Sequence, residues 1–330
     1  MTQVETAIVV PSVRKKCIEE FLNQSGSKHF DGCAIYVVED NPDKTFDVSQ
    51  YPNVIHFSWK DIDSDLGKNK WIIPRKTDCI RSYGFYKAWQ HGSKYIISLD
   101  DDCYPVPSEE KTNWVSSHIM NLTEIEREES AWVSTIEGLK PRGMPFEDTK
   151  KSCSPMISHG LWTENPDLDA ITHIPLLNSP EYKDYQFVSQ YIPHGYYYPM
   201  CGMNVAFKSE ITPIMYFLLM GKDYEYDRFG DIWCGIFSKK ILDHLSYDVW
   251  SGTPIVRHIK ASDPWVNLEK EKPGYKVNEM LWEYIDKVPM AGHSYGECYV
   301  YLANLVRGLN SPYWDKLSDA MNIWKELFDA

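Results

Sequence analysis

The sequence predicts an α/β fold in which a mostly parallel, Rossmann-type sheet is flanked by helices and followed by a helical C-terminal extension. Within residues 6–99, short β-rich runs alternate with segments of helical spacing, which is the pattern of parallel sheets. Polar residues follow three of the four runs, where such sheets bind ligands. The chain of 330 residues is long enough for one large domain with additions. The four runs are 6–10, 34–38, 54–57 and 95–99.

Helices are predicted where apolar residues recur every three or four positions, as Cys17, Ile18, Phe21 and Leu22 do after the first strand. Residues 138–198 are rich in Pro, Gly and polar groups, so we expect irregular, partly mobile structure there. The remaining predicted strands are 131–136, 204–207 and 254–258, and the remaining predicted helices are 78–90, 239–245 and 312–328.

Charge and composition exclude several classes of protein. The net charge of −13 argues against nucleic acid as a partner, because such binders need concentrated Lys and Arg. The longest apolar run, 214–220, is too short to span a bilayer, and the N-terminus lacks a basic signal region. Eight cysteines without a CxxC pair disfavour a zinc ribbon and fit reduced thiols. We therefore expect a cytoplasmic protein with no membrane span, and homo- or hetero-oligomers are left open.

The strongest local signal is YIISLDDDCYP, in which a hydrophobic strand runs into Asp100, Asp101 and Asp102. Adjacent carboxylates repel one another unless a cation or hydrogen bonds offset the repulsion. Hard oxygen ligands of this kind suit Mg²⁺ or Mn²⁺ bridging a diphosphate, and a strand-end DxD is the diphosphate–metal signature of many glycosyltransferases. The alternative is an Asp-rich turn or helix cap, which the buried character of the strand disfavours.

Residues after the other strands are candidates for contact with a nucleotide. Glu39 and Asp40 follow the second strand and offer acceptors for a base or ribose, unless they form a surface turn before Pro42. Pro11 and Arg14 follow the first strand, and Arg14 either meets a phosphate near the start of a helix or is simply solvated there. Lys76 is a further candidate for the nucleotide site.

Three candidates lie in the second half of the chain. Asp231, in RFGDIWCG, is a candidate general base or ligand of sugar hydroxyls. His258 and Lys260 follow a short strand in PIVRHIKASDPW. His258 is a candidate third metal ligand, and Lys260 a candidate cation for phosphate charge. The alternative for His258 is a satisfied polar residue without a ligand role.

Several of these segments resemble the plant reversibly glycosylated polypeptides, the UDP-arabinopyranose mutase family, which is a glycosyltransferase-like group. They occur in the order of the family and span roughly residues 6–271, whereas the tail from about 275 has no counterpart that we identify. The matching stretches are VVPSVR, SLDDDCYP, SHGLW at 158–162, YPMCGMNVAF at 198–207, MYFLLMG at 215–221, RFGDIWCG at 228–235 and SGTPIVRHIKASDPWVNLEKE at 251–271.

The resemblance implies a GT-A-like catalytic domain over residues 1–271, binding a UDP-sugar with Mn²⁺ or Mg²⁺, and a helical extension over 272–330 packed on it. It implies ribose and metal roles for Asp100 and Asp102, a late metal-ligand role for His258, and contact with the sugar or acceptor for Asp231. The family also carries an arginine that becomes glycosylated, shortly before its SHGLW-like segment.

The glycosylated arginine has no clear equivalent in this chain. Counting back from Ser158 without a gap places Lys150 at that position. Arg142, in PRGMPF, matches a different family arginine and is kept as a catalytic candidate. Self-glycosylation at arginine is therefore not expected, and neither is a close copy of the family mechanism.

Three functions remain open at this point. The first is a UDP-sugar pyranose/furanose mutase, with UDP-arabinose as the expected substrate. The second is a glycosyltransferase that passes the sugar to a separate acceptor, which needs the same donor site. The third is a non-catalytic nucleotide-sugar-binding partner subunit, although retention of the acidic residues and His258 speaks against it.

Overall fold

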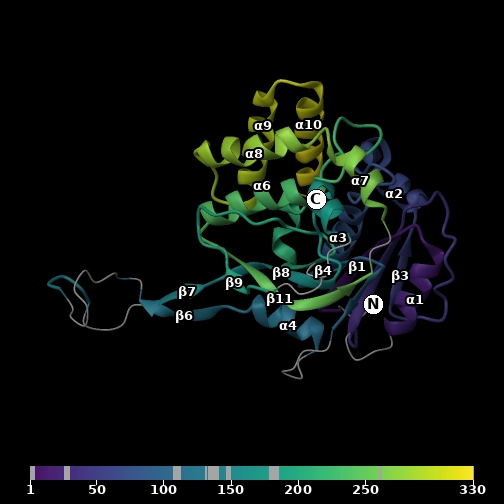
Figure 1. The fold of residues 1–330 in the computed structure, drawn as a ribbon, viewed down its shortest axis with the longest axis horizontal. Helices are drawn as coiled ribbons and strands as arrows, with labels where there is room; N and C mark the ends of the chain where they lie inside the picture. Colours follow the sequence, from purple (N-terminus) through teal and green to yellow (C-terminus); the bar gives the residue numbers. More distant parts are fainter. Residues whose placement is uncertain are drawn as a thin grey trace.

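The computed structural model describes residues 4–25, 30–106, 113–130, 132, 141–145, 150–177, 186–259 and 262–329. Within them a central sheet of nine strands is flanked by helices on both faces (Figure 1). The first half of the sheet is parallel throughout, in the order β3-β2-β1-β4. Its strands are β1 (Thr6–Ser12), β2 (Cys33–Glu39), β3 (Val54–Phe57) and β4 (Tyr95–Leu99). The predicted α/β class and these four strands are thereby confirmed.

The second half of the sheet mixes directions. The order continues from β4 to β10, β8, β11 and β5, with β9 pairing β11 at one end. Strand β8 is parallel to β11, whereas the pairs of β10 with β4 and of β11 with β5 are antiparallel. These strands are β5 (Cys103–Pro105), β8 (Pro155–Glu164), β9 (Gln190–Tyr191), β10 (Asn204–Lys208) and β11 (Asp248–His258).

Strand β8 corrects one prediction. Irregular structure was expected across 138–198, yet β8 is a ten-residue strand in the interior of the sheet. The strand was not predicted because its sequence contains polar residues. Ser158 and His159 are buried, and their hydrogen-bond partners lie far away in sequence. The strand predicted at 131–136 lies outside the described residues, apart from Trp132.

Alternate residues of β1 divide the core into two layers. Ala7 and Val9 face one layer, and Ile8 and Val10 face the other, as the two-residue period of a strand requires. The first layer contains α3, α6 and the C-terminal helices, which lie above the sheet in Figure 1, and the second contains α1 and α4. The helices are α1 (Lys15–Ser25), α2 (Trp59–Leu66), α3 (Ile80–Gln90), α4 (Trp114–Asn121), α5 (Ala170–Leu176), α6 (Gly230–His244), α7 (Pro264–Glu271), α8 (Tyr275–Lys287), α9 (Tyr295–Val306) and α10 (Pro312–Glu326).

Helix α3 approaches the sheet closely because it carries Gly84. A Cβ atom at this position would lie 2.4 Å from a methyl carbon of Val9 and 2.9 Å from one of Val38. A larger residue would push α3 away from β1 and β2. The glycine thus fixes the height of α3 above the sheet, and with it the position of the residues at the start of the helix.

The C-terminal helices share the first core layer with the sheet. Trp314 and Trp324 of α10 and Leu302 of α9 are buried in the same cluster as Val9. The predicted helix at 312–328 is confirmed by α10, while the domain boundary at residue 271 stays a prediction. No helix among the described residues has the length and apolar character needed to cross a membrane.

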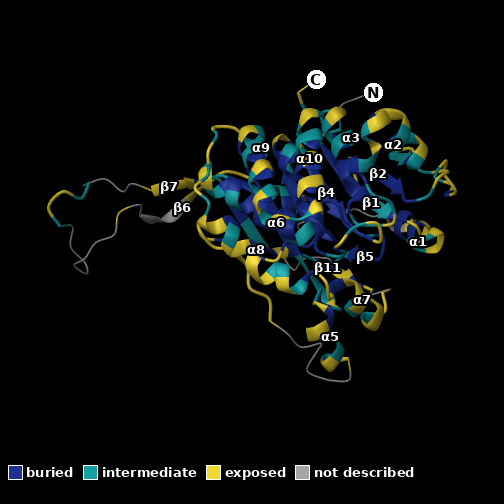
Figure 2. Ribbon diagram, turned by 90° about the horizontal axis from the view of Figure 1, so that it is seen from above, coloured by how far each residue is buried: buried dark blue, intermediate teal, exposed yellow. Residues whose placement is uncertain are grey.

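A two-stranded arm leaves the body of the molecule. It consists of β6 (Ile125–Ser130) and β7 (Lys150–Cys153), which pair with each other and not with the central sheet. Figures 1 and 2 show the arm extending away from both helical layers. Figure 2 also shows that the buried residues concentrate in the body.

Buried His118 ties α4 to two strands and makes stability depend on pH. Its Nε2 lies 2.9 Å from Oδ1 of Asn204, and its Nδ1 lies 2.9 Å from Oγ of Ser158. The Asn204 amide nitrogen donates to two carbonyls, so Oδ1 is the acceptor and Nε2–H of a neutral ring donates to it. Burial lowers the pKa of His118 to about 4.

We expect the parent protein to lose more stability than His118→Gln as pH falls from about 7 to about 4.5. The unfolded histidine takes up a proton near its ordinary pKa of about 6.5, whereas the folded one does so only near 4. The stabilisation is thus present at neutral pH and is lost as pH falls through this window. Urea unfolding at each pH should show a difference of about 2 kcal/mol between the two proteins. Parallel pH profiles would contradict this role for His118.

Candidate functional site

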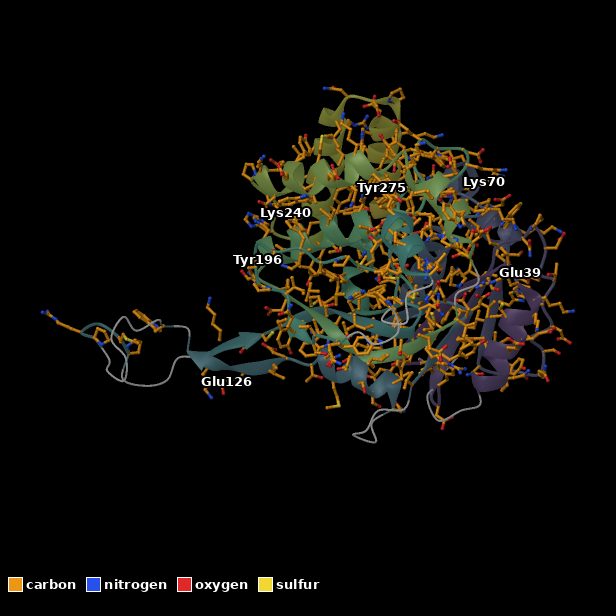
Figure 3. All side chains as sticks on the ribbon, in the orientation of Figure 1. Glu39, Lys70, Glu126, Tyr196, Lys240 and Tyr275 are labelled. Carbon is orange, nitrogen blue, oxygen red and sulfur yellow. The ribbon has the colours of Figure 1, made fainter. Side chains whose placement is uncertain are left out.

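A cleft of about 840 Å³ opens at the carboxyl ends of the parallel strands. Its size is in the range of small-molecule sites. Its walls come from the ends of β1, β2 and β4, the start of α3, the start of α6, and α7 and α8. Figure 3 labels Tyr275, which lines the cleft from α8. The lining residues used below are Pro11, Ser12, Arg14, Asp40, Lys76, Asp78, Arg81, Asp100, Asp101, Asp167, Asp227, Arg228, Asp231 and Glu271.

Arg81 fixes the floor of the cleft from the first turn of α3. Its Nη1 donates to Oγ of Ser98 at 2.8 Å and to the carbonyl of Gly202 at 2.7 Å, and its Nη2 donates to Oδ1 of Asp100 at 2.7 Å. Burial works against the charge, but the carboxylates of Asp100 and Asp78 raise the pKa of Arg81 above its usual value. Asp100 is therefore held by Arg81 at the end of β4. No local sequence pattern points to Arg81.

Asp101 forms a second charged group with residues that follow β1. It accepts hydrogen bonds from Oγ of Ser12 and from the guanidinium of Arg14, whose Nε lies 3.4 Å from Oδ2. Arg14 also pairs with Asp102 through Nη1 at 3.1 Å. Burial raises the pKa of Asp101, and these hydrogen bonds oppose the rise. Arg14 thus bridges two of the three aspartates, and Pro11 lies beside it in the cleft wall.

Asp102 and His258 come together because β11 pairs with β5. In this antiparallel ladder His258 lies opposite Cys103. One carboxylate oxygen of Asp102, Sγ of Cys103 and one ring nitrogen of His258 all lie within 4.8 Å of one another. Burial, followed by the charge of Asp100, raises the pKa of Asp102 to about 6. A cation beside this carboxylate would offset both effects and favour its ionised form.

The donor set fits a divalent cation in part. Nδ1–H of His258 donates to the carbonyl of Asn165 at 2.8 Å, which leaves Nε2 without a proton and able to bind a metal. Burial raises the pKa of the Cys103 thiol well above its usual range, and a neutral thiol is a poor ligand for Mn²⁺ or Mg²⁺. Of the predicted set Asp100, Asp102 and His258, the structure groups the last two, while Asp100 pairs with Arg81.

The candidates after β2 separate into a cleft residue and a buried one. Asp40 lines the cleft, accepts from Nε1 of Trp59 at 2.6 Å, and presents its carbonyl to Nζ of Lys76. Burial raises the pKa of Asp40. Lys76 lines the same wall with a φ of 60°, in the left-handed range that non-glycine residues uncommonly adopt.

Glu39, in contrast, is fully buried and is not among the residues that line the cleft. Its carboxylate accepts from the backbone of Thr45 and Phe46 and from Asn41, and it pairs with His56 at 2.9 Å. Although burial opposes ionisation, these hydrogen bonds lower the pKa of Glu39. Glu39 therefore organises the loop after β2, and its contact with a nucleotide stays a prediction. Figure 3 labels Glu39, the last residue of β2.

Asp231 lies in the first turn of α6, in the wall of the cleft. Its two carboxylate oxygens accept from the backbone N–H groups of Gly202 at 2.8 Å and Ile232 at 2.9 Å. Burial, followed by the charge of Asp167, raises the pKa of Asp231 to about 6. Asp78, which the sequence analysis missed, lies in the same wall just before α3, and burial followed by the charge of Asp231 raises its pKa to about 7.

The remaining candidates are not brought into the cleft. Arg142 is exposed in a described turn between β6 and β7 and is not a lining residue. Lys150 is exposed on β7, where its Nζ lies 3.9 Å from Glu126, which Figure 3 labels on the arm. Lys260 lies outside the described residues.

Comparison with protein families gives one match over the full chain. The family model described as "Reversibly glycosylated polypeptide" matches residues 1–330. UDP-arabinopyranose mutase 1 of Arabidopsis thaliana is 34% identical over 341 residues, covering 98% of this chain and 92% of the relative. Probable UDP-arabinopyranose mutase 1 of Zea mays is 34% identical over 342 residues, covering 98% of this chain and 90% of the relative.

Solved structures that match this chain include glycosyltransferases. Glucosyl-3-phosphoglycerate synthase from Mycobacterium tuberculosis, with Mn²⁺, UDP and glucosyl-3-phosphoglycerate, matches 87% of this chain and 81% of its own, with a TM-score of 0.46 and 12% identity. Mannosyltransferase PcManGT from Pyrobaculum calidifontis, with GDP-Man and Mn²⁺, matches 98% of this chain and 87% of its own, with a TM-score of 0.39 and 11% identity. Both TM-scores lie below 0.5, so these likenesses say nothing about function.

We expect Asp102→Asn to weaken Mn²⁺ binding by about tenfold or more, because a charged oxygen ligand becomes neutral. Calorimetric titration of the protein with Mn²⁺ alone measures this. Cys103→Ala is the matched control, because burial keeps the thiol of Cys103 neutral and a neutral thiol is a poor ligand for Mn²⁺. The Mn²⁺ affinity of this variant should stay within about twofold of the parent. Equal Mn²⁺ affinity for the parent and Asp102→Asn would remove Asp102 from the metal site.

Proposed function

Because the chain belongs to the reversibly glycosylated polypeptide family, we propose that it is a metal-dependent mutase that interconverts the pyranose and furanose forms of a UDP-sugar, with UDP-arabinose as its substrate. The family match spans the chain, and the curated relatives carry the name UDP-arabinopyranose mutase. These relatives support an enzyme role and the choice of reaction. The observation that carries the proposal is the cleft, which combines cations suited to a diphosphate with carboxylates suited to a sugar.

The first part of the proposed site binds the nucleotide. The carboxylate of Asp40 and the ammonium of Lys76 offer an acceptor and a donor beside the end of β2. The guanidinium of Arg14 donates from Nε and Nη2 to Asp101 and forms an ion pair with Asp102 through Nη1, and it has further N–H groups to offer a phosphate oxygen. We assign the uridine to Asp40 and Lys76, and the diphosphate to Arg14.

The second part of the proposed site stabilises charge when the anomeric bond breaks. A divalent cation held by Asp102 and His258 would neutralise the diphosphate as it leaves. Arg14 lies next to Asp102 and supplies a fixed positive charge at the same place. Asp100, held by Arg81, is left to accept a hydrogen bond from the ribose. Return of the same UDP to the re-closed sugar then needs no acceptor molecule.

The third part of the proposed site contacts the sugar. Asp231 lies in the cleft wall on α6, and its carboxylate is oriented by two backbone N–H groups. We assign the sugar hydroxyls to it. Arg142 and Lys150 receive no role in this proposal, because both are exposed between or on the strands of the arm and neither lines the cleft.

We expect purified protein with UDP-arabinopyranose and Mn²⁺, but without acceptor, to form UDP-arabinofuranose. Chromatography that separates the two ring forms measures the product. Intact-protein mass spectrometry of the same mixture should show no pentose-sized increase that maps to Lys150, because this residue is exposed on the arm and does not line the cleft.

Two results would contradict the proposal in different ways. Absence of furanose product, with sugar transferred once an acceptor is added, would make the protein a glycosyltransferase. An adduct mapped to Lys150 or Arg142 would replace the held-UDP route with a self-glycosylating one. The same incubation with Asp102→Asn serves as the control for a reaction that depends on the metal site.

A further inference from the structure

Asp78 and Asp231 form a pair of carboxylates in one wall of the cleft. Asp78 precedes α3 and Asp231 begins α6, so the pair joins two helices that are more than a hundred residues apart in sequence. Among the neighbouring charges, that of Asp231 raises the pKa of Asp78 the most. Two carboxylates that line the same wall of the cleft and repel one another favour a state in which they share one proton.

Gly230 makes room for this pair. A Cβ atom at position 230 would lie 2.8 Å from Oδ2 and 3.1 Å from Oδ1 of Asp78. The same Cβ atom would lie 2.9 Å from the backbone carbonyl oxygen of Phe217, so glycine is required at position 230 on two sides. The absence of a side chain at 230 therefore allows the carboxylate of Asp78 to lie directly beside the backbone that carries Asp231.

The surroundings of the two carboxylates differ. Asp231 accepts from the N–H groups of Gly202 and Ile232, and such hydrogen bonds favour the ionised form. No N–H or O–H group among the described residues donates to the carboxylate of Asp78. Asp231 is therefore the ionised member of the pair, and Asp78 the member that keeps the proton. The pKa values of about 6 for Asp231 and about 7 for Asp78 follow the same order.

Resting on the function proposed above, we infer that Asp78 is the general acid and Asp231 the general base of the ring contraction. After the C1–O bond to UDP has broken, a sugar hydroxyl attacks C1 and gives its proton to Asp231. The bond from C1 to the old ring oxygen then breaks, and that oxygen receives the proton of Asp78. UDP attacks C1 again and completes the isomer.

The pair matches the proton balance of this reaction. Ring contraction removes one proton from the attacking hydroxyl and adds one to the departing ring oxygen. The number of protons on the sugar is therefore unchanged overall. A pair that holds one proton can do both without exchange with water. After one contraction the proton lies on Asp231, and the reverse reaction, or transfer between the two carboxylates, restores the starting state.

Other charged groups around the pair come from four parts of the fold. Arg81 of α3 faces both carboxylates and favours their ionised forms. Asp227 and Arg228, just before α6, act on Asp78 with opposite signs, and Arg228 pairs with Glu271 of α7 at 2.8 Å. Asp167, which follows β8, raises the pKa of Asp231. These groups set the pH at which the pair holds one proton.

The test compares Asp78→Asn with the parent on UDP-arabinopyranose and Mn²⁺. We expect ring contraction to fall about a hundredfold or more, because the acid is lost, while UDP affinity stays within about twofold. Release of free UDP by hydrolysis should persist, since it needs only the C1–O bond to break. Asp286→Asn, on the exposed side of α8, is the matched control and should behave as the parent.

The pH profile adds a readout that a structural role does not change. The parent rate of contraction should rise as pH passes through about 6, where Asp231 ionises, and fall as pH passes through about 7, where Asp78 loses its proton. Asp231→Asn should remove the acid limb and Asp78→Asn the alkaline limb. Profiles that keep both limbs in both variants would overturn the assignment.

A carboxylic acid kept at position 78 tests the assignment directly. Asp78→Glu keeps a carboxylic acid on the same side of the cleft, and we expect it to recover contraction by about tenfold or more over Asp78→Ser. No recovery, or equal loss of contraction and UDP affinity in Asp78→Asn, would make Asp78 a structural residue. A parent that binds UDP but forms no furanose would instead overturn the proposed function itself.

Discussion

The arrangement of the cleft depends on one buried cation, the guanidinium of Arg81. It joins α3 to the end of β4 through Ser98 and Asp100, and to the segment before β10 through the carbonyl of Gly202. Removing one partner from such a group leaves an uncompensated buried charge, which costs about 3–5 kcal/mol. The close approach of α3 at Gly84 brings Arg81 within reach of these partners. Asp100 can therefore point into the cleft in one fixed orientation.

The rest of the cleft is a balance of charge around that cation. Carboxylates from β4, the start of α6 and the loop before α3 outnumber the cations, and burial raises the pKa of Asp101, Asp102, Asp78 and Asp231. Arg14 neutralises part of the charge at Asp101 and Asp102. A divalent cation at Asp102 and His258 would neutralise more of it and leave Arg14 free to bind phosphate. Nucleotide and metal are thus expected to bind together.

Local patterns were enough to predict part of this structure. The four parallel strands and the aspartates at the end of β4 could be found because hydrophobic runs and their polar ends are adjacent in sequence. Arg81 and Asp78 could not be found in this way, because the residues with which they interact, such as Gly202 and Asp231, lie more than a hundred positions away in sequence. The same limit explains why β8 was not predicted. Its buried polar residues are typical of a loop in the local sequence, and their hydrogen-bond partners, His118 and Ser251, are distant in sequence. Asp102 and His258 meet through the antiparallel register of β11 and β5, which no local pattern specifies.

The dependence of the cleft on Arg81 is tested most directly by the UDP affinity of Arg81→Lys in the presence of Mn²⁺. Lysine keeps the charge but lacks the planar fork that reaches Ser98, Gly202 and Asp100 together. Calorimetry should show a loss of about tenfold or more, with Arg307→Gln, an exposed arginine paired with Asp319, unchanged. If Arg81→Lys binds UDP as the parent does, the cleft does not depend on this interaction and the central claim is wrong.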